Sequence, residues 1–199
     1  ARRILPALIT VILISLPFAY ILLLPNNFVE FAYSILFSLG FTSNLFFLNI
    51  GQIYGAESSL LKPFLHTWSL AVEEQYYLLF PIMLIFFNKY FKKTLFLIFI
   101  IGFIISLFFA NWASYNYPSI NFYILPTRGW ELLLGSIIAY VEIRKYKIPK
   151  NSLFNFILSI LGICLIIYSI YSFNINTHHP SLYTLLPVLG VSLLILFLK

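Results

Sequence analysis

Long apolar stretches separated by short polar segments dominate the pattern of this chain. A helix that crosses the hydrocarbon core of a bilayer, about 30 Å thick, needs about 20 predominantly apolar residues, with about 17 as the lower limit. Six stretches meet this requirement and are predicted to span the membrane: 4–24, 66–87, 94–113, 126–142, 153–173 and 182–198. The pattern therefore predicts an all-α fold, a polytopic transmembrane helical bundle of about six spans.

The stretch 28–48 is also long enough to span, but polar residues such as Glu30 and Asn44 interrupt it. The basic residues bear on its path, because Lys and Arg accumulate in cytoplasmic loops. If 28–48 does not cross and Arg2 and Arg3 are cytoplasmic, 10 of the 12 basic residues fall on the cytoplasmic side. We therefore predict a re-entrant or interfacial segment, packed in protein or facing a wet cavity.

Composition agrees with a membrane location. Hydrophobic residues make up 61% of the chain and charged residues only 9%, whereas a soluble domain is about 25% charged. The net charge of +6 does not indicate nucleic-acid binding, because the basic residues lie between apolar spans, where they set orientation. A single cysteine, Cys164, excludes an internal disulfide and a cysteine-based zinc cluster. Since the chain begins with Ala1 and ends inside a span, we expect it to be a piece of a longer protein.

Polar residues at the start of the second predicted span form the first candidate site, because ionisable groups inside a membrane usually face a cavity, a partner or a pathway. Residues three and four apart share a helix face, which groups His66, Ser69, Glu73 and Tyr77. Glu73 lies about 10 Å further along the helix than His66. Glu74 points about 100° away and needs its own partner. These carboxylates either pair with basic groups and join helices, or serve a functional site.

The second candidate site lies at the start of the fourth predicted span, where Arg128 and Glu131 are three residues apart on one face. Gly135 continues this face and is expected to let another helix approach closely. The two charged residues either form an ion pair within the helix, or Arg128 binds an anionic substrate group or balances Glu73 or Glu74.

Two adjacent histidines, His178 and His179, form the weakest candidate. They share no helix face and have no carboxylate nearby, so a solvated loop is the better interpretation than a metal site. We predict no bound metal. The sequence contains no phosphate-binding loop, dinucleotide-binding fingerprint or zinc-protease motif.

Three stretches carry a resemblance to a known family. Residues 66–81 read HTWSLAVEEQYYLLFP, residues 2–6 read RRILP, and residues 122–135 read FYILPTRGWELLLG. In order and spacing they resemble the signature motifs of the membrane acyltransferase family 3, which includes bacterial O-antigen and peptidoglycan O-acetyltransferases. The first motif is long and specific, and the resemblance covers essentially the whole chain, 1–199, as a partial acyltransferase domain.

The resemblance implies a bundle of about ten spans in a bacterial inner membrane. Such proteins move an acyl group, usually acetyl from acetyl-CoA, onto a hydroxyl of an extracytoplasmic glycan. The six predicted spans fit if two precede Ala1 and about two follow Lys199. The family's catalytic Arg and His would then precede this chain, so we expect the chain alone to be inactive. The Lys62-Pro63 leader before the first motif and the W-E-L block of the third motif look most like a subgroup with a further C-terminal hydrolase-like domain.

The resemblance also implies roles for individual residues. Arg2 and Arg3 are expected to bind the phosphates of the acyl-CoA donor at the cytoplasmic face. The charged residues expected to build and polarise the catalytic site are Glu73, Glu74, Arg128 and Glu131. The residues expected to line the acceptor pocket are His66, Trp68 and Ser69. The expected partners are the acyl-CoA donor, a glycan acceptor and membrane lipids, with no bound cofactor and no nucleic acid.

Two other function classes stay open on the residues alone. A membrane transporter or flippase for a polar or acylated substrate would also use intramembrane Glu and Arg, although we find no inverted repeat of the kind that would favour it. A helical scaffold that only binds partner subunits would tolerate neutral replacement of Glu73 and Arg128. The family resemblance favours the acyltransferase over both.

Overall fold

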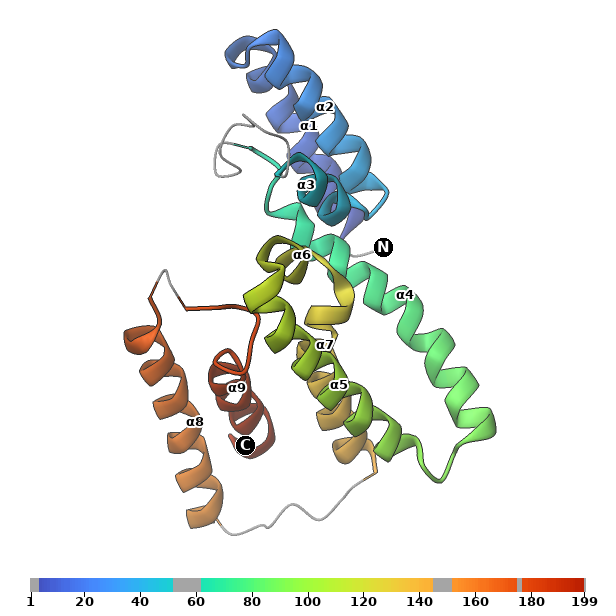
Figure 1. The fold of residues 1–199 in the computed structure, drawn as a ribbon, viewed down its shortest axis with the longest axis vertical. Helices are drawn as coiled ribbons and strands as arrows, with labels where there is room; N and C mark the ends of the chain where they lie inside the picture. The colour runs from blue at the N-terminus through green and yellow to red at the C-terminus, as the bar shows by residue number, and fades with distance from the viewer. Residues whose placement is uncertain (1–3, 52–61, 145–151, 175–176, 199) are drawn as a thin grey trace. The chain divides into compact units, whose positions relative to one another are not determined.

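A computed structural model describes residues 4–51, 62–144, 152–174 and 177–198. These residues are helices joined by short turns and loops, with no strand among them, which confirms the predicted all-α class. The chain forms two compact units, Ala1–Pro81 and Ile82–Lys199. Figure 1 shows the helices of each unit.

The first unit is built from α1 (Leu5–Leu22), α2 (Pro25–Leu39), α3 (Ser43–Ile50) and the start of α4 (Thr67–Tyr90). Proline stands in the first turn of both α1 and α2, where its missing N–H would have no partner anyway. Only two residues separate α1 from α2, so α2 runs back along α1 as a hairpin (Figure 1).

The predicted segment 28–48 is a helix, a break and a second helix. At the break Phe41 adopts a φ of 53°, and Thr42 N–H donates to the Phe37 carbonyl at 2.9 Å, which ends α2. Four polar side chains of the segment, Ser34, Ser38, Ser43 and Asn44, are buried, and Glu30 and Thr42 are half-buried. Four of its polar groups are therefore packed in protein. The re-entrant path itself stays a prediction.

The second unit contains α5 (Leu95–Asn116), α6 (Pro118–Tyr123), α7 (Leu125–Ile143), α8 (Ser152–Ser172) and α9 (Leu185–Phe197). Helix α5 packs on α7, and α8 packs on α9. The fully buried Trp130 centres the core of this unit and packs with Leu107 and Ala110 of α5.

Two glycines allow α8 and α9 to approach closely. A Cβ placed on Gly162 would lie 2.7 Å from the Gly190 carbonyl oxygen, and the reverse distance is also 2.7 Å. The sequence prediction assigned a close approach to Gly135 instead, and it is wrong: a Cβ there would meet nothing within 4 Å. Gly135 instead lines a groove of about 280 Å³ between α7 and α9. The close glycine contact of α9 is made with α8.

The described helices coincide with the six predicted spans to within a few residues. Four of them, α1, α4, α5 and α8, are long and apolar enough to cross a membrane. Helix α9 has 13 residues and α7 has 19, and neither belongs to this group. The polytopic helical character is confirmed, and the count of six spans stays a prediction.

Candidate functional site

An open cavity of about 740 Å³ lies between the first turns of α1 and α4. Its polar lining comes from α4: His66, Thr67, Ser69, Glu73, Glu74 and Tyr77. Its apolar lining comes from α1 and includes Ile4, Ala7, Leu8 and Val11. The helical face predicted from the sequence is therefore confirmed, and it faces a cavity. Glu74 reaches the cavity as well, from the adjacent position.

Ile4 and Glu73 line the same cavity. The predicted place of Arg2 and Arg3, which directly precede Ile4, at the cytoplasmic face stays a prediction. Arg2 and Arg3 themselves lie outside the described residues.

Buried hydroxyl groups hold the first turn of α4 in place. The Ser38 and Thr67 hydroxyls are 2.7 Å apart, and the Ser43 hydroxyl donates to the Thr67 carbonyl at 2.9 Å. Thr67 is therefore bound both through its side chain and through its backbone. Because His66 and Ser69 flank Thr67, these contacts fix where the cavity lining begins.

Gln75 ties the next turn of α4 to the break between α2 and α3. Its Nε2 donates to the Phe41 carbonyl and to Asn44 Oδ1, both at 2.9 Å. Phe41 is the residue with positive φ, a conformation that costs about 1–2 kcal/mol for a residue with a side chain. Sequence reasoning missed this role of Gln75. The sequence did contain a signal for it. Gln75 is a polar residue inside an apolar helix and needs polar partners, and the segment 28–48 contains such residues.

An ion pair joins Lys62, just before α4, to Glu30 of α2. The two side chains retain 11% and 33% of their exposure. They line a small cavity of about 30 Å³ together with Asn27 and Ser34. The pair anchors the segment leading into α4, and neither residue reaches the larger cavity.

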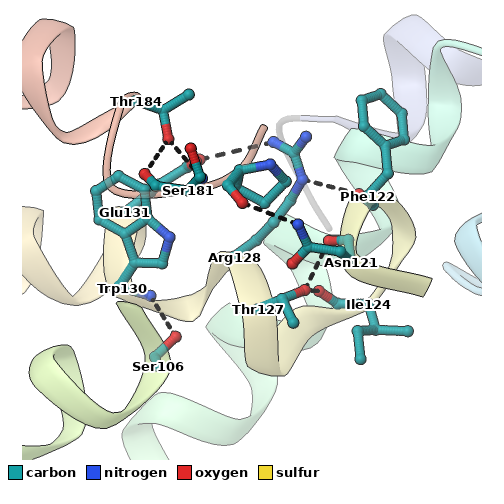
Figure 2. Close-up of polar contacts among 11 residues, drawn as sticks. Ser106, Asn121, Phe122, Ile124, Thr127, Arg128, Trp130, Glu131, Ser181 and Thr184 are labelled. Carbon is teal, nitrogen blue, oxygen red and sulfur yellow. Dashed lines mark hydrogen bonds and ion pairs between the residues drawn. The ribbon is translucent and has the colours of Figure 1, made fainter. Parts of the chain in front are cut away.

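Figure 2 shows the second candidate site, at the start of α7. Arg128 Nη1 lies 3.7 Å from Glu131 Oε2, which confirms an ion pair within the helix. Arg128 Nε also donates to the Phe122 carbonyl at 2.8 Å, and the guanidinium carbon lies 4.9 Å from the centre of the Phe122 ring. Burial raises the pKa of the adjacent Tyr123 phenol above its ordinary value. That Arg128 balances Glu73 or Glu74 stays a prediction.

Hydrogen bonds from buried residues set the path of the chain into α7 (Figure 2). The Thr127 hydroxyl donates to the Asn121 carbonyl at 2.7 Å, and Asn121 Nδ2 donates to the Pro180 carbonyl at 2.8 Å. The Ser106 hydroxyl accepts from Trp130 N–H at 2.9 Å. Sequence reasoning missed these three polar residues. Asn121 and Ser106 bond to backbone groups 59 and 24 positions away in the chain.

The remaining predicted residues lie apart from these two sites. Trp68 is not among the residues that line the α1–α4 cavity, since it is one position from Ser69, a turn of about 100° around α4. Its role in an acceptor pocket stays a prediction. His178 and His179 are exposed, and the His178 ring lies 4.4 Å from that of Tyr115. Among the described residues no group of three or more His, Cys, Asp or Glu could hold a metal ion.

Comparison with known proteins agrees with the motifs. A family model described as an acyltransferase domain matches residues 1–199. A protein of Haemophilus influenzae described as uncharacterized is 35% identical over 204 residues, which cover 98% of this chain and 82% of that protein. No solved structure matches the chain.

Two relatives have named activities. The peptidoglycan O-acetyltransferase OatA of Listeria monocytogenes is 28% identical over 192 residues, covering 92% of this chain. The O-acetyltransferase OatA of Staphylococcus aureus is 30% identical over 147 residues, covering 70%. The aligned region is 30% of the first protein and 23% of the second, so the chain spans less than a third of either. With its apolar helices, its motifs and the match over its full length, the chain belongs to the acyltransferase family 3 as an integral membrane acyltransferase domain.

Proposed function

We propose that this chain is the membrane part of an O-acetyltransferase in a bacterial inner membrane. It transfers an acetyl group from a cytoplasmic acyl-CoA donor to a hydroxyl group of a cell-surface glycan. The observation that carries the proposal is the α1–α4 cavity, which brings His66, Glu73 and Glu74 to one open space in a span of otherwise apolar character. The names of the OatA relatives supply the reaction class.

The reaction needs a base, because a sugar hydroxyl is a poor nucleophile while it holds its proton. As the proton leaves, the hydroxyl oxygen attacks the thioester carbonyl and forms the new ester bond. The carbon–sulfur bond then breaks, and CoA leaves as a thiolate that takes up a proton. We assign the proton transfer to Glu73 and His66, acting with the catalytic His that the family places in a preceding helix. Ser69 and Tyr77 supply hydroxyl groups beside them.

Arg2 and Arg3 are proposed to bind the phosphates of the donor. They stand directly before Ile4, which lines the cavity. A donor held there directs its thioester toward the cavity that Ile4 lines. Guanidinium groups suit this role, because their fork of donors matches phosphate oxygens.

Arg128 is proposed to act as a fixed positive charge. Its Nε is already engaged by the Phe122 carbonyl and its Nη1 faces Glu131. A charge held in this way stabilises an anionic group without having to reorient during the reaction. Glu131 fixes the arginine, and it also lines the groove between α7 and α9.

The test uses the full-length gene, expressed in a host without glycan O-acetylation. Ester-linked acetate on surface glycan is measured by mass spectrometry for wild type, Glu73→Gln and Arg128→Ala at equal membrane levels. Glu142→Gln is the matched control, because Glu142 is an exposed carboxylate at the far end of α7. We expect acetate in wild type and control and at least a hundredfold loss in Glu73→Gln. Acetate in every variant would make both residues structural, and none in wild type would favour a transporter.

A further inference from the structure

A second large cavity lies in the second unit, away from Arg128 and Glu131. It measures about 650 Å³ and lies among the end of α5, the end of α8 and the segment leading into α9. Ligand pockets in proteins commonly measure about 300–1,000 Å³. The residues that give it its chemistry are Tyr115, Tyr168, Asn174, Thr177, His178 and Tyr183.

The lining combines aromatic rings with uncharged polar groups. None of the described residues that line the cavity is Lys, Arg, Asp or Glu. Tyr115 and His178 place their rings 4.4 Å apart at an angle of 48°. Tyr168 and Tyr183 add two phenol groups, and Asn174 adds an amide that can both donate and accept. Without a charge to balance an ionic group, this lining suits a neutral ligand that has both an apolar face and hydroxyl groups.

The segment that carries His178 is held on both sides. The Ser181 hydroxyl donates to the His178 carbonyl at 2.6 Å, and Ser181 is fully buried. The Leu182 N–H donates to Asn111 Oδ1 at 3.3 Å. The Pro180 carbonyl, two residues after that of His178, accepts from Asn121 Nδ2. The cavity wall is therefore fixed in place before a ligand binds, which lowers the entropic cost of binding.

The same segment connects the cavity to the Arg128 site. His179 follows His178 in the chain, and its ring lies 6.4 Å from the Phe122 ring, over which the Arg128 guanidinium stands. A ligand that contacts His178 therefore lies next to His179, which neighbours the Phe122 ring under the Arg128 guanidinium. This arrangement suits a chain-like substrate with one unit in the cavity and another nearer the charged residues.

We infer that this cavity binds a neutral sugar ring of the acceptor glycan. That the sugar belongs to the acceptor rests on the proposed transferase function. The C–H face of a pyranose packs on aromatic rings, and its hydroxyl groups bond to amide and phenol groups. The competing interpretation is an interfacial belt of tyrosines that only contacts lipid headgroups. Tyr171 offers the comparison, because it lies on α8 three residues from Tyr168, is 85% exposed and does not line the cavity.

The test measures sugar binding directly, with the full-length protein purified in detergent. The probes are triacetylchitotriose and maltotriose as neutral sugars, and tri-galacturonate as a charged one, each followed by saturation-transfer NMR. We expect a neutral trisaccharide to bind with a Kd of about 1 mM. Tyr168→Ala and Tyr115→Ala should each weaken binding about tenfold, the effect of one lost ring contact. Tyr171→Ala should bind as wild type does, and Tyr115→Phe, which keeps the ring, should retain most of the binding.

Each outcome decides a different claim. Three results would overturn the sugar site. The first is that neither neutral sugar binds, and the second is that tri-galacturonate binds as tightly as the neutral sugars. The third is that Tyr168→Ala binds the neutral sugar as tightly as Tyr171→Ala does. If acetate transfer persists in that case, the transferase proposal stands without it. If the neutral sugar binds as expected but wild type transfers no acetate, the sugar site stands and the transferase proposal fails. Thermal stability of the variants is measured alongside, and the Tyr115→Phe result separates loss of the ring from loss of the fold.

Discussion

The contact between Gly162 and Gly190 predicts that alanine at Gly190 destabilises the α8–α9 pair. A Cβ on Gly190 would lie 2.7 Å from the Gly162 carbonyl oxygen and 2.9 Å from Ile166 Cγ1, below the range of ordinary contacts that begins at 3.4 Å. The oxygen belongs to the backbone, so a side-chain rotation cannot relieve the overlap. The two helices would have to separate, and Ser192, which is buried on α9, would lose packing with them.

Two opposing contributions set the magnitude. Alanine is a better helix former than glycine by about 1 kcal/mol. Overpacking a close contact costs about 1–3 kcal/mol, and the backbone position of the clash favours the upper half of that range. We therefore expect Gly190→Ala to lower the free energy of unfolding by about 1–2 kcal/mol. Gly135→Ala is the matched control, because a Cβ there meets nothing within 4 Å; it should raise stability by up to about 1 kcal/mol.

The assay is reversible unfolding of the full-length protein in mixtures of mild detergent and dodecyl sulfate, followed by circular dichroism. The two alanine variants should shift the midpoint in opposite directions from wild type. Equal midpoints for Gly190→Ala and Gly135→Ala would refute the reasoning, because glycine content and helix propensity are the same in both changes. The close atoms of α8, above all the Gly162 oxygen and Ile166 Cγ1, distinguish them.

Three further predictions follow from individual contacts. Arg128→Lys keeps the charge but loses the Nε bond to Phe122, so surface acetate should fall to near the Arg128→Ala level; full activity would mean that charge alone suffices. Gln75→Leu removes three hydrogen bonds and should lower the free energy of unfolding by about 1–3 kcal/mol in the same assay; an unchanged midpoint would contradict this. Glu30→Gln should destabilise by about 1–2 kcal/mol by leaving Lys62 unpaired, and adding Lys62→Met should restore part of the loss; additive losses would argue against coupling.

The helices could be predicted from the sequence because their signal is local. Runs of apolar residues without charges define α1, α5 and α8, and any bilayer-spanning helix must satisfy its backbone groups within itself. The face of α4 that carries His66 and Glu73 was equally predictable, because the spacing of residues on one helix fixes it. The ion pair of Arg128 follows the same rule.

The paths between helices could not be predicted in this way. The count of basic residues favoured a segment 28–48 that stays on one side, and this path stays a prediction. That count averages over the chain and carries no information on the α2 hairpin. The close approach was likewise assigned to the wrong glycine, because Gly135 and Gly190 look alike until the partner helix is known. Partners such as Gln75 and Phe41 lie 34 positions apart in the sequence.

The two charged sites differ in what surrounds them, and the proposed function gives them different roles for that reason. Arg128 is enclosed: its guanidinium has a carbonyl, a carboxylate and an aromatic ring around it, with 19% of the side chain exposed. A group held by so many contacts changes its position little, so it suits the electrostatic stabilisation that we propose for it. Glu73 and His66 are exposed to an open cavity, which a substrate hydroxyl can enter. We therefore propose proton transfer for the face that His66 and Glu73 form, and charge stabilisation for the start of α7.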